Sequence, residues 1–430
     1  MRRRLGLLTP YHIGLILAFA LALGLRVVVA SVFLGLGSAP KFSAQPDQID
    51  YEQLAFSMST GAGYATPDGL PTARRPPGTS LTLLPAYAAA GRSFTVGRLW
   101  FCLLSALTCL AAAWLAAQCF GPAVGLVSAF WLALYPGHFY YPMHFVSEVP
   151  YGFWLTLACG SMVSALRDAR HVNRFTLLAG ACLGLAVLTR PQIALVVPIA
   201  GLLALLSRRT TRQELIHLAT AAVVMGAVLL PWVVRNTVVM GKPTLSTVGG
   251  VTFWGANNET VLNDPQLRGL WLRSSDLIDD RHPLSGTEIQ KEEQAWQYGV
   301  DFVARNAGRM PGLVAMKVWR LVSPFEATEN RVVWWTFAVA WLFTVPWAVA
   351  GIVLALKDDR DHIAGGVLLV PLAATLMTTL VFYGSIRFRD SIIPLLVVLA
   401  ARALVRVAPR LRAHGITRLD DPIGPLAAKD

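Results

Sequence analysis

The sequence predicts an all-α polytopic membrane protein with a bundle of about ten transmembrane helices. Of its 430 residues, 55% are hydrophobic and only 14% are charged, whereas a soluble protein carries charge on about a quarter of its residues. Several uncharged runs also approach or exceed the roughly 20 apolar residues that a spanning helix needs. These observations exclude a soluble globular protein, a disordered tail and a fibrous repeat.

The spans follow from the uncharged or nearly uncharged runs. The first run is interrupted by Arg26, a costly residue inside a membrane that we expect to find a carboxylate or carbonyl partner in the bundle. The run 99–147 is long enough for two helices, with a turn at Phe120-Gly121-Pro122. The runs are 11–37, 99–147, 149–166, 175–189, 191–207, 215–234, 332–356, 362–386 and 391–401.

The distribution of Lys and Arg predicts the orientation. The uncharged stretch Thr79–Gly91 is too short to cross, and if it lies on the surface, 17 Lys and Arg fall in the cytoplasmic segments. If it crossed, 14 of those 17 would lie outside. We therefore expect a bacterial inner (plasma) membrane protein with both termini in the cytoplasm, anionic lipid headgroups accounting for much of the net charge of +12. The pair 175–207 fits either two spans or a re-entrant hairpin.

This topology divides the chain into three parts. Residues 1–234 form an N-terminal transmembrane module with a first outer loop (38–97) that contains interfacial helices. Residues 235–331 form a small second outer loop domain, with 11 acidic and 11 basic residues. Residues 332–430 supply the C-terminal transmembrane helices and a basic cytoplasmic tail.

Other classes of function lack support. The five cysteines lie in apolar stretches without a CxxC motif or a His cluster, so neither zinc nor a disulfide framework is indicated. No aromatic-basic motif points to nucleic acid. No Gly-rich phosphate loop points to a nucleotide.

Charged residues left unexplained by topology gather near the predicted outer face. Arginines on that side run against the positive-inside tendency, and with a few carboxylates they suggest a site that holds a phosphate and handles a proton. The bases are Arg26, Lys41, Arg74, Arg75, Arg92, Arg98, Arg190, Arg387 and Arg389, and the acids are Asp47, Asp50, Glu52, Asp68, Glu148 and Asp390.

The richest stretch follows the first span. Asp47 and Tyr51 are spaced i, i+4, which puts them on one face of a helix. A simpler interpretation is a surface helix with Asp47 as its cap behind Pro46. Further on, Pro76 and Pro77 stiffen the chain and fix the direction of Arg75.

In their order, these motifs resemble the GT-C glycosyltransferases, and among them the protein O-mannosyltransferase and aminoarabinose–lipid A transferase family (glycosyltransferase family 39-like). The resemblance covers roughly residues 11–256 and 330–405. The chain departs from the family pattern at Gln48, where an acid is frequent, and in lacking the larger C-terminal outer domain of some relatives. The matching motifs are Asp47-x-x-x-Tyr51, Arg75-Pro76-Pro77, Ser147-Glu148, Leu188-Thr189-Arg190-Pro191, Pro231-Trp232-Val233-Val234-Arg235-Asn236 and Arg387-Phe388-Arg389.

The resemblance implies that Asp47 is the catalytic base, and Asp50 is the alternative base if the register differs by three. Glu148, which opens a span where the family more often has Asp, would orient the acceptor or a sugar hydroxyl. Arg75, Arg190, Arg387 and Arg389 are candidates for the lipid phosphate, although each could instead reach toward headgroups. Arg235 fits a structural role or a ligand role equally well. The expected substrate-binding residues are Tyr51, Arg75, Glu148, Arg190, Arg235, Arg387 and Arg389.

The expected activity is transfer of a sugar from a polyprenyl-phosphate donor to a hydroxyl or similar acceptor (protein, lipid or glycan) on the periplasmic or extracellular side, with inversion. No cofactor is expected, because two scattered carboxylates without His make a poor cage for a divalent metal. A transporter or flippase for a lipid-linked or anionic substrate is the alternative. A membrane scaffold would leave the Asp47 and Arg75 cluster unexplained.

Overall fold

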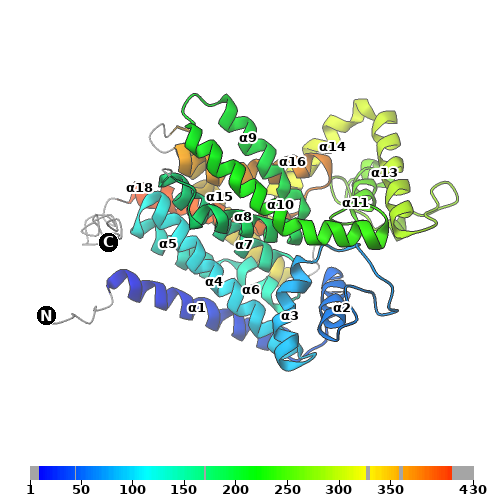
Figure 1. Ribbon diagram of the computed structural model, residues 1–430, viewed down its shortest axis with the longest axis horizontal. Coiled ribbons are helices and arrows are strands. Elements are labelled where there is room, and N and C mark those ends of the chain that lie inside the picture. Colours follow the sequence, from blue (N-terminus) through cyan, green and yellow to red (C-terminus); the bar gives the residue numbers. More distant parts are fainter. Residues whose placement is uncertain (1–8, 44, 169–170, 326–329, 358–361, 409–430) are drawn as a thin grey trace.

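The computed structural model describes residues 9–43, 45–168, 171–325, 330–357 and 362–408, and these ranges are helical without a β-sheet. A single isolated bridge joins Ala65 to Pro71. Figure 1 shows a bundle of long helices with a cap of shorter helices at one end.

Ten helices of the bundle correspond to the ten predicted spans. Six of them, α1, α4, α7, α10, α15 and α16, are long and apolar enough to cross a membrane. The other four have 11 to 16 residues, so the number of ten spans stays a prediction. The ten are α1 (Pro10–Phe33), α4 (Phe94–Phe120), α5 (Pro122–Leu134), α7 (Glu148–Arg167), α8 (Arg174–Thr189), α9 (Val196–Leu206), α10 (Arg212–Met240), α15 (Arg331–Lys357), α16 (His362–Val381) and α18 (Ile393–Val407).

The predicted turn between α4 and α5 is confirmed. Gly121 has a φ of 95°, a region that favours glycine, and Pro122 begins the next helix at its first position. One long apolar run thereby becomes an antiparallel pair.

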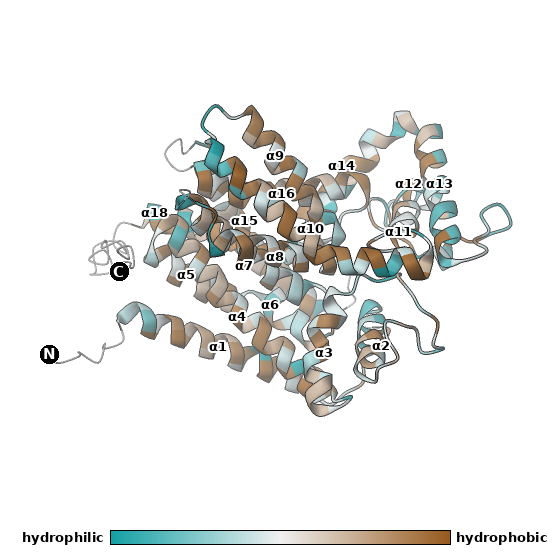
Figure 2. Cartoon of the chain, viewed as in Figure 1, coloured by the Kyte–Doolittle hydropathy of each residue, from teal (hydrophilic) through white to brown (hydrophobic). Residues whose placement is uncertain are grey.

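Small residues let the bundle helices approach closely. Gly180 and Gly184 lie one turn apart on α8, and a Cβ at these positions would lie 2.5 Å from the Ala221 carbonyl oxygen and 2.7 Å from Val228 Cβ of α10. This spacing is the small-xxx-small pattern of membrane helix pairs. Figure 2 shows apolar residues along the outer sides of α1 and α10, where exposed leucines and valines indicate a lipid-facing surface.

Arg26 finds the carbonyl partners that its place inside α1 requires. Its guanidinium is fully buried and donates to the carbonyl oxygens of Ala22 (2.8 Å) and Ala133 (3.4 Å), while its Nε donates to Ser105 Oγ (2.8 Å). It therefore ties α1 to α4 and α5.

The first loop and the second loop form the cap. The first holds α2 (Asp47–Ser59) and α3 (Gly78–Ala90), and the 13 residues of α3 span only about 20 Å, less than a membrane core. The length of α3 agrees with the prediction that Thr79–Gly91 stays on the surface. The second holds α11 (Gly249–Ala256), α12 (Glu259–Asn263), α13 (Glu288–Arg305) and α14 (Met310–Val322).

Short segments complete the fold. They are α6 (Pro136–Tyr140), α17 (Ile386–Ser391), and the 3₁₀ turns η1 (Tyr141–Met143), η2 (Pro191–Leu195), η3 (Ser274–Asp276) and η4 (Ala307–Arg309).

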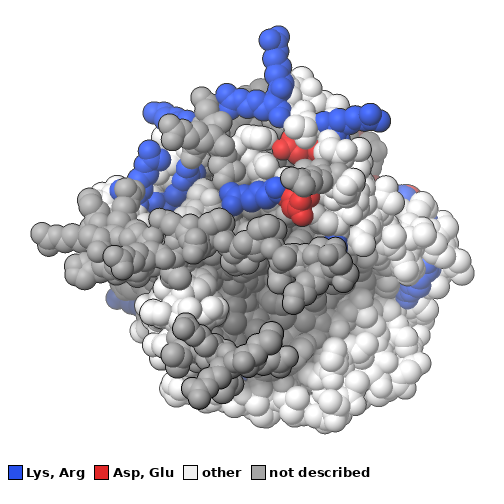
Figure 3. Space-filling model, turned by 60° about the vertical axis from the view of Figure 1, so that its left-hand side comes forward, with Lys and Arg blue, Asp and Glu red and all other residues white. Residues whose placement is uncertain are grey.

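Basic side chains gather at the end of the bundle opposite the cap. This is the end where α1 begins and α18 ends (Figure 1), and Figure 3 shows several Lys and Arg side chains along its upper part. The exposed ones at the ends of bundle helices include Arg167, Arg174, Arg208, Arg212 and Lys357. The arrangement has the polarity that the positive-inside rule predicts. The residues 1–8 and 409–430, which carry further predicted cytoplasmic charges, lie outside the described ranges.

Candidate active site

Asp47 stands at the first position of α2 and faces the bundle. Pro46 precedes it without any side-chain cap bond, and the Asp47 carboxylate accepts instead from two arginines, Arg75 and Arg387. The helix-cap interpretation is therefore wrong. A quarter of the Asp47 side chain (26%) remains exposed, so a substrate can reach it.

Arg75 is held by the loop that enters α3. Its Nη2 lies 2.6 Å from Asp47 Oδ1 and its Nε lies 2.9 Å from Asp50 Oδ2. The guanidinium also lies over the ring of Tyr51, 5.7 Å from its centroid. Pro76 and Pro77 fix the backbone that follows. Asp47 and Tyr51, predicted to share one face of a helix, both contact the Arg75 guanidinium.

Arg387 joins this cluster from the other end of the chain. It lies on α17, and its Nη1 donates to Asp47 Oδ2 (3.2 Å) while its Nε makes a short ion pair with Glu148 Oε1. Glu148 opens α7, as predicted, and its side chain is 2% exposed. One arginine thus links the first outer loop to the start of α7.

Two contacts place the segment between α16 and α17. The N–H of Gly384 donates to Gly269 O (3.0 Å), and Nζ of Lys317, on α14, donates to the carbonyl of Val381 (3.1 Å). A Cβ at Gly384 would strike the backbone of Lys317. The second outer loop therefore supports the short connection that aims Arg387.

Arg190 completes the cluster at the break between α8 and η2. Its Nη2 lies 2.8 Å from Glu148 Oε1, and its Nε donates to Ser147 Oγ (3.0 Å). The extended backbone at Arg190 (φ −140°) turns its side chain toward α7, because Pro191 cannot continue α8. Arg190 also lies between the rings of Tyr151 and Phe388.

The site therefore contains three carboxylates and three guanidiniums in one connected set. Burial acts to raise the pKa of Asp47, but Arg75 and Arg387 outweigh it and hold that pKa well below its usual range. Burial similarly raises the pKa of Tyr51. Asp47 is ionised at neutral pH, and the Tyr51 hydroxyl keeps its proton. The members are Asp47, Asp50, Arg75, Glu148, Arg190 and Arg387.

Two of the predicted residues lie apart from this cluster. Arg235 donates to the carbonyl oxygens of Thr72 (2.7 Å) and Tyr64 (2.8 Å), so it braces the loop that carries Arg75. Arg389 pairs with Asp390 (3.2 Å) and donates to Ser323 O (2.7 Å). Both guanidiniums lie among protein partners outside the Asp47 cluster, and the substrate-binding role expected of each stays a prediction.

Sequence reasoning missed Ser147, Tyr151 and Phe388 as neighbours of Arg190. Ser147 and Phe388 belong to the matching motifs but were not predicted as site residues, and Tyr151 lies within one helical turn of Glu148. A search along the helix of Glu148 and around Arg387 would have found them.

Within the described ranges, no three His, Cys, Asp or Glu side chains are grouped so that they could hold a metal ion. The expectation that no metal is required stays a prediction.

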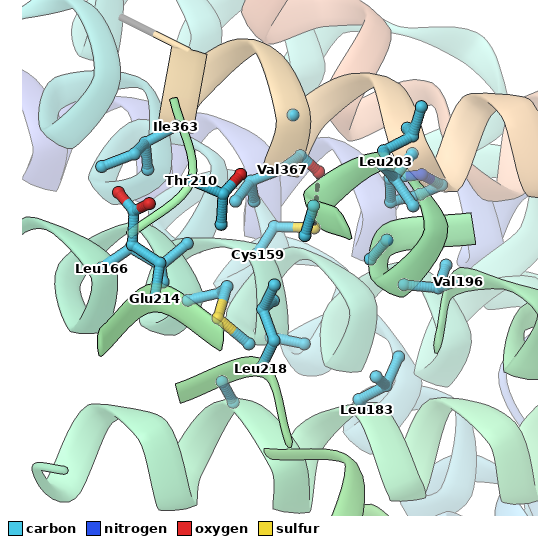
Figure 4. A pocket seen from close by; sticks show the side chains of 18 of the residues that line it. Cys159, Leu166, Leu183, Val196, Leu203, Thr210, Glu214, Leu218, Ile363 and Val367 are labelled. Carbon is cyan, nitrogen blue, oxygen red and sulfur yellow. Dashed lines mark hydrogen bonds between the residues drawn. The ribbon is translucent and has the colours of Figure 1, made fainter. Parts of the chain in front are cut away.

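An apolar cavity of about 350 Å³ lies deeper in the bundle. Figure 4 shows its wall, with Leu218 and Leu183 below and Ile363 and Val367 above, and Cys159 donating to the carbonyl of Val367. Its walls come from α7, α8, α9, α10 and α16, and Glu214 and His362 stand at its far end. A smaller cavity between Arg190, Tyr151 and Thr378 lies along the same two helices, α7 and α16.

Residues 74–234 match the family described as Dolichyl-phosphate-mannose-protein mannosyltransferase. This segment of the chain is therefore similar to that family. The match includes Arg75, Glu148 and Arg190, and it is narrower than the resemblance that the motifs indicated, since Asp47 and Arg387 fall outside it. A search of curated proteins finds no match.

Solved structures share the fold. The archaeal oligosaccharyltransferase AglB from Archaeoglobus fulgidus, in complex with an inhibitory peptide and a dolichol-phosphate, is 15% identical with a TM-score of 0.57, covering 98% of this chain and 52% of that chain. The apo form of this enzyme is 16% identical with a TM-score of 0.55, covering 95% of this chain and 52% of that chain. ArnT from Cupriavidus metallidurans bound to undecaprenyl phosphate is 17% identical with a TM-score of 0.42, covering 91% of this chain and 78% of that chain. The chain thus spans about half the length of the archaeal enzyme and shares its fold over that part.

Proposed function

We propose that this chain is a membrane glycosyltransferase that moves a sugar from a polyprenyl-phosphate donor to a hydroxyl or similar acceptor, at the outer face of a bacterial inner membrane. The observation that carries the proposal is the environment of Asp47. Its side chain is partly exposed and forms ion pairs with arginines from two distant parts of the chain, which keep it ionised. The family name, which specifies a dolichyl-phosphate sugar, and the dolichol-phosphate bound by the archaeal relative support the class of donor.

The donor phosphate docks on Arg387 and Arg190 in this proposal. Both guanidiniums are shared with Glu148, and a phosphate brings stronger acceptors for the same donors. When Arg387 turns toward the phosphate, it loosens its contact with Asp47. Asp47 is then left with Arg75 and becomes a better base, so binding of the donor prepares the site for reaction.

The chemical step is a direct displacement. The acceptor oxygen attacks the anomeric carbon, its proton passes to Asp47, and the bond from that carbon to the phosphate oxygen breaks. The leaving polyprenyl phosphate needs fixed positive charge rather than a proton, which Arg387 and Arg190 provide. A single attack from the side opposite the phosphate inverts the anomeric centre. We keep Asp50, which also contacts Arg75, as the alternative base.

Glu148 has a free acceptor for the sugar. Its Oε1 receives both arginines, while its buried Oε2 has no hydrogen-bond partner among the described residues. A buried carboxylate oxygen without a donor is costly. We propose that a hydroxyl of the donor sugar donates to it, and that Tyr51, whose ring lies beneath Arg75, borders the same space.

We propose that the prenyl chain follows α7 and α16 away from the phosphate. A cavity of about 10 Å³ beside Arg190 and the 350 Å³ cavity further along both lie against these two helices. The leucine- and valine-rich wall of the larger cavity suits isoprene units, which gain about 25 cal/mol for each Å² removed from water. The acceptor reaches the site from the outer side, where the second outer loop lies beside α2 and α3.

An assay in proteoliposomes with a panel of polyprenyl-phosphate sugars tests this function. Wild type is expected to form a covalent product, and Asp47→Asn to lower turnover by about 10²- to 10⁴-fold, the range for a positioned base. Asp68→Asn, the same change at an exposed position of the same loop, is the matched control and should keep full activity. Relocation of the donor without covalent product would instead support a transporter, and wild-type turnover in Asp47→Asn would remove Asp47 from its role.

A further inference from the structure

The backbone next to Arg75 is held by the second outer loop. The Thr247 N–H donates to the carbonyl oxygen of Ala73 (3.0 Å), and Ser246 Oγ donates to that of Arg74 (3.0 Å). Segments about 170 residues apart in sequence therefore meet one or two residues before Arg75.

Glu288, the first residue of α13, is the centre of this junction. Its Oε1 accepts from the Ala73 N–H (3.0 Å) and makes a short hydrogen bond with Thr247 Oγ1, while its Oε2 accepts from Thr72 Oγ1 (2.8 Å). One carboxylate thus bonds both outer loops. Charge-assisted bonds of this kind are about twice as strong as neutral ones.

The segment between the Glu288 contacts and Arg75 is short and held by hydrogen bonds. Ala73 is two residues from Arg75, the Arg74 N–H donates to Thr72 Oγ1 (3.0 Å), and the Tyr64 hydroxyl donates to the carbonyl of Arg75 (3.0 Å). Beyond Arg75 the chain is fixed by two prolines. A shift of α13 is therefore passed to the Arg75 guanidinium rather than absorbed by the loop.

We infer that Glu288 is a positioning residue that couples the second outer loop to Arg75 and, through it, to Asp47. An acceptor that settles on the second outer loop then alters the contact of Arg75 with Asp47 at the moment when the base is needed. The role of Asp47 in this inference rests on the proposed function, whereas the mechanical link from Glu288 to Arg75 does not.

The pH dependence of transfer reports this coupling, because Arg75 helps to hold the pKa of Asp47 low. If Arg75 moves away, Asp47 takes up its proton at a higher pH and activity is lost from the acid side first. The charged and titratable groups that act on Asp47 from every element around it are Arg75, Arg387, Arg190, Asp50, Glu148, Tyr51 and Tyr383.

The experiment compares Glu288→Gln with Glu293→Gln. Both remove one negative charge from α13, but Glu293 pairs only with Lys242 at an exposed position (2.6 Å). Glu288→Gln offers a single oxygen to three donors. In Glu288→Gln the acid limb of the pH profile of kcat/KM is expected to move up by about one pH unit, so that kcat/KM at pH values below the limb falls about tenfold. Glu293→Gln is expected to keep the wild-type profile. Thr72→Val, which removes one donor from the opposite side, should shift the limb in the same direction by less.

Hydrogen exchange of the unliganded full-length chain separates this inference from the proposed function. Residues 74–80 should exchange faster in Glu288→Gln than in wild type and in Glu293→Gln. If residues 74–80 of Glu288→Gln exchange at the wild-type rate, the inference is overturned. Faster exchange with an unshifted acid limb also overturns it, because Glu288 would then anchor the loop without acting on Asp47. If wild type transfers no sugar from any donor, the proposed function fails, and exchange alone then decides the mechanical link.

Discussion

At the scale of single residues, the contact that matters most is the one between Arg75 and Asp47. Arg75 divides its guanidinium between Asp47 and Asp50. Because this positive charge lowers the pKa of Asp47, the ionised form that we propose as the base persists into acidic solution. In Arg75→Gln the pKa of Asp47 rises toward the ordinary value. We expect kcat/KM to fall by about tenfold more at pH 3 than at pH 8, measured as a full pH–rate profile.

Arg74→Gln is the matched control for this variant. Arg74 is adjacent in sequence and exposed, and the described residues include no ion pair to its side chain. Its profile should overlay that of wild type. Parallel loss at all pH values in Arg75→Gln would contradict the role given to Arg75, because it would mean that Asp47 does not sense the guanidinium.

The sequence predicts that the charged residues of the site lie near the outer face of the membrane, but it does not predict which of them form ion pairs with one another. Asp47, Tyr51 and Arg75 lie within one loop, so helical spacing and two prolines predict their proximity. Arg387 contacts Asp47 across 340 residues of chain, and no local pattern encodes such a contact. Arg235 and Arg389 carry the same motif signal as Arg190, yet their partners are backbone carbonyls and Asp390, because packing of the loops decides which arginine faces the site.

At the scale of elements, the approach of α3 to the end of α8 sets the distance between Arg75 and Arg190. Gly78 begins α3, and a Cβ there would lie 2.6 Å from the backbone of Leu188 and Thr189. Gly78→Ala must push the two helices apart. Overpacking of this kind costs about 1–3 kcal/mol, so we expect a lower melting temperature in detergent and at least about tenfold lower transfer activity.

Gly226→Ala makes the same change in a helix where the added methyl group meets nothing within 4 Å. It removes a glycine from the interior of α10, and alanine favours helices more than glycine does by about 1 kcal/mol. Stability and activity should therefore be kept or slightly raised. An active and stable Gly78→Ala would mean that α3 is free to slide on α8.

Sequence periodicity predicted long helices better than short ones. The run 99–147 divides at Gly121 as expected, because glycine and proline mark that turn locally. The hydropathy pattern predicts one span over 362–386 and no helix α17, but α16 ends at Val381 and Arg387 lies on a separate six-residue helix. Contacts with α14 and Gly269 fix that short connection, and such contacts are invisible in a hydropathy pattern.

At the scale of the whole molecule, the site and the exposed basic side chains lie at opposite ends of the bundle. The cluster of Asp47 with its arginines lies where the cap meets the bundle. Arg208 between α9 and α10, Arg212 at the start of α10 and Lys357 at the end of α15 lie at the far side. By the positive-inside rule we expect the basic end to lie in the cytoplasm. In the proposed function this orientation places the sugar transfer outside, and it calls for a donor that is already there, which a lipid carrier provides.

Labelling of single cysteines tests this orientation directly. All five native cysteines are buried thiols outside any disulfide, so a membrane-impermeant maleimide should leave wild type unlabelled. Asp68→Cys, exposed in the first outer loop, should be labelled in intact spheroplasts, whereas Arg208→Cys, exposed between α9 and α10, should react only after the membrane is opened. The reverse pattern would place Asp47 in the cytoplasm, beside soluble nucleotide sugars, and the case for a lipid-linked donor would lose its physical basis.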